Sequence, residues 1–346
     1  MRRIVIVGGT GFFGRAAAER LRAHGVRPVL ASRRAGAELR VDVESRASMK
    51  AALKPYDVVL DAAGPFQART TALIEAAIET GFDVVDLSDS LRYAERVADL
   101  RLRIEAAGVR VLTSCSSVSA VGAAAIRLSG VDKPVRLDVV LRPATRHTAH
   151  AATARALFES VGRPIRVLRD GRLTEVPGWR ESRRLRWPAT GRRVRAYPSE
   201  SADALLLQPA CPSLRRIEFH VDAHVPGMNL LLALAARSRA TRRAVGALLP
   251  LGLALCRLFG SRGGGILFEV EGSDGSVVTI AMHAPAKSYL VAIAPAVLAT
   301  HAIAEGHFAP TGLVPPEQHA EARVLAAYLG SLGIDLLTLR HGRRSA

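Results

Sequence analysis

Apolar and polar positions along the first third of the chain follow two periods, one typical of strands and one typical of helices. The run Ile-Val-Ile-Val at 4–7 has no polar position, which predicts a strand buried on both faces of a sheet. The alanine-rich segment after Gly14 predicts a helix. Further strands are predicted at 27–32, 39–43, 56–66, 82–88 and 110–115, and further helices at 46–53, 71–80 and 93–107. This alternation predicts an α/β fold with a doubly wound parallel sheet.

From about residue 121 the pattern becomes that of a mixed α+β region. It predicts strands at 136–141 and 216–225, hairpins at 165–176 and 267–282, an exposed strand pair or loop at 179–197, and helices at 149–161, 228–236 and 244–259. Closing helices are predicted at 292–305 and 316–332, with a disordered tail at 340–346. We therefore expect a first α/β domain at 1–120, an α+β second domain at 121–285, and closing helices at 286–340.

A glycine-rich turn joins the first predicted strand to the first helix. Gly8, Gly11 and Gly14 have the spacing G-x-x-G-x-x-G, which allows a tight turn and a close approach of the backbone to a pyrophosphate. The unpaired N–H groups at the start of the helix favour an anion there. The turn predicts a Rossmann-type dinucleotide site made by Gly8, Gly9, Thr10, Gly11, Phe12, Phe13 and Gly14.

Arg33 and Arg34 follow Ser32 at the end of the second predicted strand. In dinucleotide folds an acidic residue there binds the ribose 2′-hydroxyl of NAD, whereas arginine accommodates the 2′-phosphate of NADP. The first acid after this strand is Glu38, so NADP(H) is the favoured cofactor, with a solvated basic loop as the alternative. Further cofactor contacts are predicted at Asp42 and Val43, and at the small residues Ala62, Ala63, Gly64 and Pro65.

Several blocks of the sequence carry a family pattern. They lie at 8–14, 63–66, 81–88 and 115–119, with fainter continuations around Asp170-Gly171, 263–272 and the terminal helices. Together they resemble the saccharopine dehydrogenase-like, NADP-binding oxidoreductase family. The resemblance implies that residues 1–120 form a Rossmann-type nucleotide domain and that 121–285 form an inserted substrate and dimerisation domain, after which the closing helices at 286–340 pack back on the first domain. It also implies dimerisation through the second domain's sheet, and dehydrogenase or reductase activity. Many relatives have a proline where this chain has Ser119, so the floor of the substrate site is expected to differ.

A hydride delivered from NADPH to an imine, carbonyl or enoyl carbon must be matched by a proton. Candidate donors or orienting groups lie at or just beyond predicted strand ends: Asp86, Ser88, Tyr93 and Cys115. A purely structural role is the alternative for each. No tyrosine has a lysine four residues later, which disfavours the proton-donor pair of short-chain dehydrogenases. The lack of an obvious acid/base pair leaves open an NADP-binding sensor or scaffold in which no hydride moves.

The net charge is +17 in 346 residues, and almost all of it is arginine, because only four lysines occur. This composition predicts affinity for anions that weakens with salt. Arginines interleaved with Trp179, Trp187 and Tyr197 are typical of an exposed edge of a substrate cleft; a grip on an anionic substrate and nucleic-acid stacking are the alternatives. We expect a small-molecule substrate, anionic or lipophilic, a homodimer, and no nucleic-acid partner.

Cysteine and histidine positions bear on redox state and metals. The three cysteines, at 115, 211 and 256, are far apart, which indicates neither a disulfide framework nor a zinc site and favours the cytoplasm. His220, Asp222 and His224 share one face of a predicted strand. A polar sheet face explains them best, with a metal or acid/base site as the alternative. No metal is expected.

Two apolar helices, predicted at 228–236 and 244–259, are flanked by arginines. Three interpretations stay open: a lid over a lipophilic substrate, a dimer contact, or peripheral membrane contact by a reductase of lipid-like substrates. The longest uncharged apolar stretch, at 244–256, is 13 residues and is too short to span a bilayer.

Overall fold

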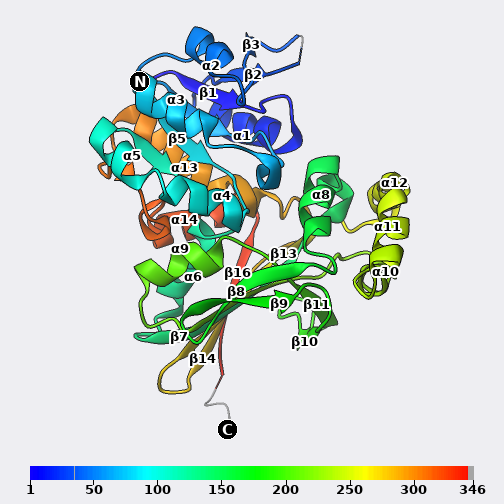
Figure 1. The fold of residues 1–346 in the computed structure, drawn as a ribbon. Helices are drawn as coiled ribbons and strands as arrows, with labels where there is room; N and C mark the ends of the chain where they lie inside the picture. Colours follow the sequence, from blue (N-terminus) through cyan, green and yellow to red (C-terminus); the bar gives the residue numbers. More distant parts are fainter. Residues whose placement is uncertain (35, 342–346) are drawn as a thin grey trace. The chain divides into compact units, whose positions relative to one another are not determined.

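The structure, a computed structural model, describes residues 1–34 and 36–341. The chain divides into two compact units (Figure 1). Unit 1 comprises Met1–Val121 and Ala292–Leu325, and unit 2 comprises Gly122–Val291 and the chain from Ala326 on. The closing segment predicted at 286–340 is thus shared between the units rather than assigned to the first one alone.

Unit 1 is built on a seven-stranded sheet in which every pairing is parallel, with the order β15-β6-β5-β4-β1-β2-β3. The strands are β1 (Ile4–Val7), β2 (Val29–Ser32), β3 (Leu39–Arg40), β4 (Val58–Asp61), β5 (Asp83–Asp86), β6 (Arg110–Leu112) and β15 (Gly312–Leu313). All residues of β1, β4 and β5 are buried, including the aspartates at the end of β4 and at both ends of β5, as expected for central strands of a parallel sheet. The short strand β15, which the sequence pattern did not predict, comes from the second segment of the unit.

The helices of unit 1 are α1 (Phe12–Ala23), α2 (Arg46–Ala52), α3 (Ala72–Thr80), α4 (Leu91–Ala98) and α5 (Arg101–Ala107), with 3-10 turns η1 (Phe66–Ala68) and η2 (Pro316–Gln318). The single helix predicted at 93–107 is two helices, since the chain turns at Asp99 and Leu100. Three helices cross the unit boundary: α6 (Ala120–Ser129), α13 (Leu290–Glu305) and α14 (Ala322–Ser331).

Unit 2 is built on a nine-stranded mixed sheet with the main order β10-β11-β12-β7-β13-β14-β16, to which β8 and β9 add beside β12. The strands are β7 (Pro134–Arg142), β8 (Pro164–Arg169), β9 (Arg172–Pro177), β10 (Arg183–Arg186), β11 (Arg193–Ser199), β12 (Arg216–Val221), β13 (Gly264–Gly272), β14 (Val277–Ala284) and β16 (Asp335–His341). The register aligns Glu218 with Asp138, and Asp138 with Glu269, so three acids of β12, β7 and β13 share one row on one face.

The remaining helices of unit 2 are α7 (Thr145–Thr148), α8 (Ala151–Glu159), α9 (Asp203–Ala210), α10 (Met228–Ala235), α11 (Arg239–Ala247) and α12 (Leu249–Phe259). The helix predicted at 244–259 is divided at Leu248, before Pro250, which occupies the first turn of α12. The helix predicted at 316–332 is limited to η2 and α14. In the described part of the chain, the structure contains no helix with the length and apolarity needed to cross a membrane.

The C-terminal prediction was wrong in its first two residues. Arg340 and His341, expected in a disordered tail, belong to β16, where they pair with Val278 and Val277 of β14. The rest of the predicted tail, 342–346, lies outside the described residues. The polar and apolar positions of β16 give no strong strand signal by themselves. The strand forms because it pairs with β14 at the edge of the sheet.

Candidate functional site

The junction of β1 and α1 has no room for side chains at two glycines, Gly8 in the loop and Gly14 in the first turn of α1. Gly8 has φ +71°, and a Cβ there would lie 2.7 Å from the backbone of Ala62. A Cβ on Gly14 would lie 2.3 Å from the carbonyl oxygen of Gly8. The Gly11 N–H donates to that same carbonyl at 2.8 Å and closes the turn. The loop therefore presents bare backbone, as a pyrophosphate site requires.

The amino terminus of α1 is open to an anion. Its N-cap residue, Gly11, makes no side-chain cap hydrogen bond, and no acidic residue occurs in the first turn. The first N–H groups of a helix have no partner within it, and the helix dipole makes this end electropositive. Thr10 donates through its hydroxyl to Ser32 Oγ at 3.2 Å, which joins the loop to the end of β2. This cradle fits a dinucleotide phosphate.

Arg33 and Arg34 are exposed just beyond β2. The backbone N–H of Arg34 donates to Ser32 Oγ at 3.2 Å, so the turn that carries both arginines is attached to the same serine as the glycine loop. No ion pair within residues 1–34 and 36–341 involves either guanidinium. Both arginines are therefore available to an anion beside the cradle.

The other predicted cofactor segments reach the same carboxyl edge of the sheet. The segment that carries Asp42 and Val43 leaves β3 beside β2, where the Val41 N–H donates to the Ser32 carbonyl at 3.1 Å. The Ala62 N–H donates to the Val7 carbonyl at 3.0 Å, next to the loop. Ala62, Ala63 and Pro65 are half-buried and Gly64 is exposed. Parallel strands place their carboxyl ends together, which is why segments far apart in the sequence meet here.

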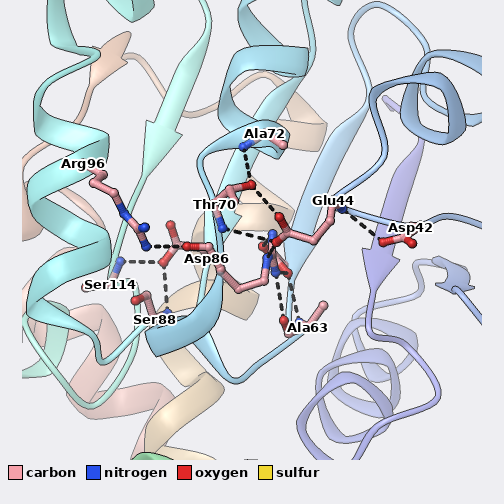
Figure 2. A network of polar contacts seen from close by, with 11 residues as sticks. Asp42, Glu44, Ala63, Thr70, Ala72, Asp86, Ser88, Arg96 and Ser114 are labelled. Carbon is pink, nitrogen blue, oxygen red and sulfur yellow. Dashed lines mark hydrogen bonds and ion pairs between the residues drawn. The ribbon is translucent and has the colours of Figure 1, made fainter.

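Arg69, which the sequence analysis missed, links two of these segments through Glu44 and the backbone of Ala63, both of which are labelled in Figure 2. Its Nε donates to Glu44 Oε1 at 2.7 Å, its Nη1 donates to the Ala63 carbonyl at 2.8 Å, and its Nη2 pairs with Asp61 Oδ2 at 3.1 Å. Burial acts against its charge, but Asp61 and Glu44 outweigh burial and raise the pKa of Arg69. The sequence did contain a signal for this arginine: Asp61 is a charged residue at the end of an otherwise apolar strand. A buried carboxylate of this kind requires a cation nearby.

The four candidate proton donors are all fully buried. Asp86 ends β5, and its Oδ1 accepts from the backbone N–H groups of Ser88 and Ser114 at 2.9 and 2.8 Å (Figure 2). Burial raises the pKa of Asp86 to about 7, although these hydrogen bonds act in the opposite direction. Its Oδ2 has no hydrogen-bond partner in the described part of the chain. Asp86 is therefore a carboxyl group that titrates near neutral pH.

The structure brings Ser88 and Cys115 to Asp86 through backbone contacts. The Cys115 N–H donates to the Asp86 carbonyl at 2.9 Å, and Ser88 Oγ accepts from the Ser90 N–H at 3.1 Å. Tyr93 packs edge-on against Phe66, with ring centroids 5.3 Å apart. Burial raises the pKa of both Tyr93 and Cys115 well above their ordinary values, and the charge of Asp86 adds to each rise. Both groups thus stay protonated at neutral pH.

The departure from the family pattern at Ser119 has a backbone counterpart. Ser119 has φ +64° and forms an isolated antiparallel bridge with Cys115. A proline ring holds φ near about −65°, so proline does not fit the conformation observed here. The backbone at position 119 therefore has a conformation that the proline of many relatives does not adopt.

In unit 2, the structure gives Asp222 and His224 of the predicted histidine-aspartate face hydrogen-bond partners within the protein. Asp222 accepts from Arg142 Nε at 2.9 Å and from Asn229 Nδ2 at 2.7 Å. Burial lowers the pKa of His220 to about 4, so this ring is neutral at pH 7. His224 lies beyond β12, half-buried, with φ +54°. Across residues 1–34 and 36–341 no group of three or more His, Cys, Asp or Glu side chains is placed to hold a metal ion.

The segment with two tryptophans forms a strand pair, but its aromatic rings are not exposed. Trp179 and Trp187 are both 0% exposed. Trp179 stacks on Tyr197, with centroids 5.0 Å apart, and Trp187 donates through Nε1 to His283 Nδ1 at 3.3 Å. Because both tryptophan rings are buried, they are not available for stacking on bases, which was one of the alternatives for this segment. Trp187 belongs to a buried apolar cluster with Val140, Leu267 and Ala281 of the sheet.

A cavity of about 820 Å³ opens on the charged face of the unit 2 sheet. Most of its lining charges are engaged with one another. Arg183 pairs with Asp138 and Glu269, and Arg136 pairs with Asp138 at 2.6 Å. Arg169 pairs with Glu218 at 2.7 Å. The grip of this segment on an anionic substrate stays a prediction.

Known proteins resemble this chain in two respects. Residues 4–112 match the family model of the saccharopine dehydrogenase NADP binding domain. The match contains the glycine loop, the arginines after β2 and the blocks at 63–66 and 81–88 that carried the family resemblance, and it confirms that resemblance for the nucleotide domain. It also identifies a nicotinamide dinucleotide as the class of cofactor. No curated protein matches the chain.

Solved structures match over nearly the whole chain. The L-Glu-forming saccharopine dehydrogenase of Saccharomyces cerevisiae has a TM-score of 0.65 at 14% identity, covering 99% of this chain and 100% of that one. The homospermidine synthase of Legionella pneumophila, solved in complex with NAD, has a TM-score of 0.64 at 11% identity, covering 100% of this chain and 94% of that one. At these identities the likeness shows the fold alone: a Rossmann-type sheet, and a second domain with a mixed sheet whose main segment is inserted within the first unit.

Proposed function

We propose that the protein is an NADPH-dependent oxidoreductase that reduces an imine, carbonyl or enoyl substrate, because residues 4–112 match the family model of the saccharopine dehydrogenase NADP binding domain. The observation that carries the proposal is the start of α1, which has no side-chain cap. Beside it, a Cβ on Gly8 or on Gly14 would collide with the backbone. Exposed Arg33 and Arg34 beside this cradle support the phosphorylated cofactor.

The bound nicotinamide would supply the hydride, and the chain would supply position and the proton. Backbone N–H groups at the start of α1 bind the pyrophosphate, and Arg69 holds the segments after β3 and β4 in place through Glu44 and the Ala63 carbonyl. Among the four donor candidates, Asp86 has a pKa of about 7, so its carboxyl can both hold and release a proton near neutral pH. Ser88 and Ser114 orient that carboxyl through their N–H groups.

The first experiment is a fluorescence titration of the purified chain with NADPH and NADH. Arg33→Ala should weaken NADPH by roughly 10- to 150-fold, the value of a charge-assisted contact of about 1.5 to 3 kcal/mol, and should leave NADH nearly unchanged. Arg22→Ala, an exposed arginine in the last turn of α1, is the matched control and should change neither affinity. Equal losses for both cofactors in Arg33→Ala would mean that this arginine does not contact the 2′-phosphate.

The reaction class is tested by following oxidation of NADPH with a panel of imines, aldehydes or ketones, and enoyl compounds. Turnover with one class identifies the substrate chemistry. Full burial of Asp86, Ser88, Tyr93 and Cys115 favours one competing function, a sensor or scaffold that binds NADP without hydride transfer. Tight binding of NADPH without oxidation across the panel would favour that sensor, and failure to bind either cofactor would refute both functions.

A further inference from the structure

Helices α10, α11 and α12 form a group of short helices at the edge of unit 2 (Figure 1). This group exposes large apolar side chains, each between 40% and 70% exposed. We call them the apolar helical surface: Leu230, Leu231 and Leu234 of α10, and Leu248, Leu251, Leu255, Leu258 and Phe259 at α12. Scattered apolar residues on a surface are ordinary, but a concentration of this kind marks an interaction site.

The exposed residues of α12 follow helical spacing. Leu248, Leu251, Leu255 and Leu258 stand three or four residues apart, so they form one stripe along the helix. The inner side of α12 is held by other groups. Arg257 donates to the Ala149 carbonyl at 3.1 Å, and a Cβ on Gly252 would lie 4.0 Å from the Met228 side chain of α10. The stripe is thus the outer face of an anchored helix.

The charge of this region has one sign. Residues 223–268 contain six arginines and no aspartate or glutamate. Arg237, Arg239 and Arg243 are exposed between α10 and α11 and along α11. None of the ion pairs formed within residues 1–34 and 36–341 involves these three side chains. Arg239 and Arg243 are one helical turn apart and face the same side.

We propose that the apolar helical surface and its arginines dock the protein on the face of an anionic lipid bilayer. Apolar side chains enter the boundary between headgroups and acyl chains, and the arginines bind lipid phosphates, as in amphipathic helices that lie in the interface plane. The helices have 8, 9 and 11 residues, which suits this position and is too short for a span. A second copy of the chain is a poorer occupant, because a two-fold contact through this surface brings arginines against arginines with no acid to pair them.

The test is flotation of the full chain with vesicles of phosphatidylcholine, with and without phosphatidylglycerol. We expect binding that requires the anionic lipid and weakens with salt. Each arginine near such a surface raises partitioning about fivefold, so Arg239→Glu with Arg243→Glu should lower it by about 25-fold or more. Leu251→Ser, Leu255→Ser and Leu258→Ser together should lower it by at least about tenfold.

Matched controls come from unit 1. Leu102, on α5, is 78% exposed, and Leu102→Ser should bind vesicles like the wild type. Arg92→Glu with Arg103→Glu removes the same charge from other exposed positions and should lower binding by less than the α11 pair. Circular dichroism and NADPH affinity check that each variant is folded, because neither depends on lipid.

Two results would overturn the proposal: no flotation of the wild type with anionic vesicles, or equal losses in the α11 pair and in the control pair. Dissociation of a dimer by the leucine variant, measured by light scattering, would assign the surface to a second copy instead. The test needs no cofactor. Flotation without NADPH binding therefore refutes the proposed enzyme alone, and NADPH binding without flotation refutes the docking surface alone.

Discussion

Asp86 in unit 1 and Asp138 in unit 2 are equally buried, at 0% and 2% exposed, but are held in opposite ways. Asp86 accepts hydrogen bonds from two backbone N–H groups, and burial raises its pKa to about 7. Burial acts in the same direction on Asp138, but Arg183 and Arg136 outweigh it and lower the pKa of that carboxyl. At neutral pH Asp86 is close to its titration point, whereas Asp138 is charged.

The difference shows that burial alone does not decide the state of a carboxyl group. Asp61 and Asp86 are register partners at the ends of β4 and β5. Asp61 has Arg69, and its charge adds to the raised pKa of Asp86. Arg69 pairs with Asp61 and Glu44, so Asp61 is paired, whereas Asp86 accepts backbone hydrogen bonds and is left to hold a proton. Unit 2 avoids this state by placing two arginines around Asp138.

The largest expected effect comes from removing the cation of Asp61. Arg69→Met leaves a fully buried carboxylate without its partner and should lower the free energy of unfolding by about 3 to 5 kcal/mol at pH 7. Arg183→Met should cost less, about 1 to 3 kcal/mol, because Asp138 keeps Arg136. Urea denaturation of both variants measures the difference. Equal losses would mean that the second arginine of Asp138 does not compensate.

The next expected effect is a dependence of stability on pH. Between its ordinary value of 3.8 and about 7, native Asp86 holds a proton that the unfolded chain releases, so it lowers the free energy of unfolding as pH rises. The slope is at most about 1.4 kcal/mol per pH unit. Asp86→Asn should remove this slope, so the variant gains relative to the wild type from pH 4 to pH 7. Denaturation at several pH values measures it, and parallel curves would contradict the raised pKa.

Asp138→Asn is the matched comparison with the opposite sign. The lowered pKa of Asp138 gives stability that is present above its ordinary value of 3.8 and is lost as pH falls below it. This variant should therefore lose most at neutral pH and approach the wild type in acid. A loss that grows as pH falls would overturn the assigned role of Arg183 and Arg136.

The smallest effect is expected at an exposed pair. Arg101 Nη1 lies 3.6 Å from Glu105 on α5, and the two side chains are 55% and 47% exposed. Arg101→Ala should change the free energy of unfolding by no more than about 0.5 kcal/mol, because solvent screens such pairs. Thermal denaturation measures it. A loss above about 1 kcal/mol would show that exposure does not separate this pair from the buried ones.

Much of the first unit could be predicted because its signals are local. Four apolar residues at 4–7 make a central strand, and glycines at 8 and 14 make a turn that no side chain fits. Boundaries were less predictable: β3 has two residues where five were expected, and the helix at 93–107 is broken. Strand ends depend on neighbours in the sheet, which a single segment does not specify.

By itself the sequence predicted the central strands of the first unit, the glycine turn before α1 and the resemblance to the saccharopine dehydrogenase NADP binding domain, which the family model matches over residues 4–112. These signals are readable because strand periodicity and glycine spacing lie in consecutive residues. Only the tertiary structure decided that Arg69 belongs to Asp61, that Trp179 and Trp187 are buried, and that β16 completes the second sheet. It also decided that the four candidate donors are buried and that one of them titrates near pH 7. The physical reason is that burial, ion pairing and pKa depend on residues brought together from distant parts of the chain.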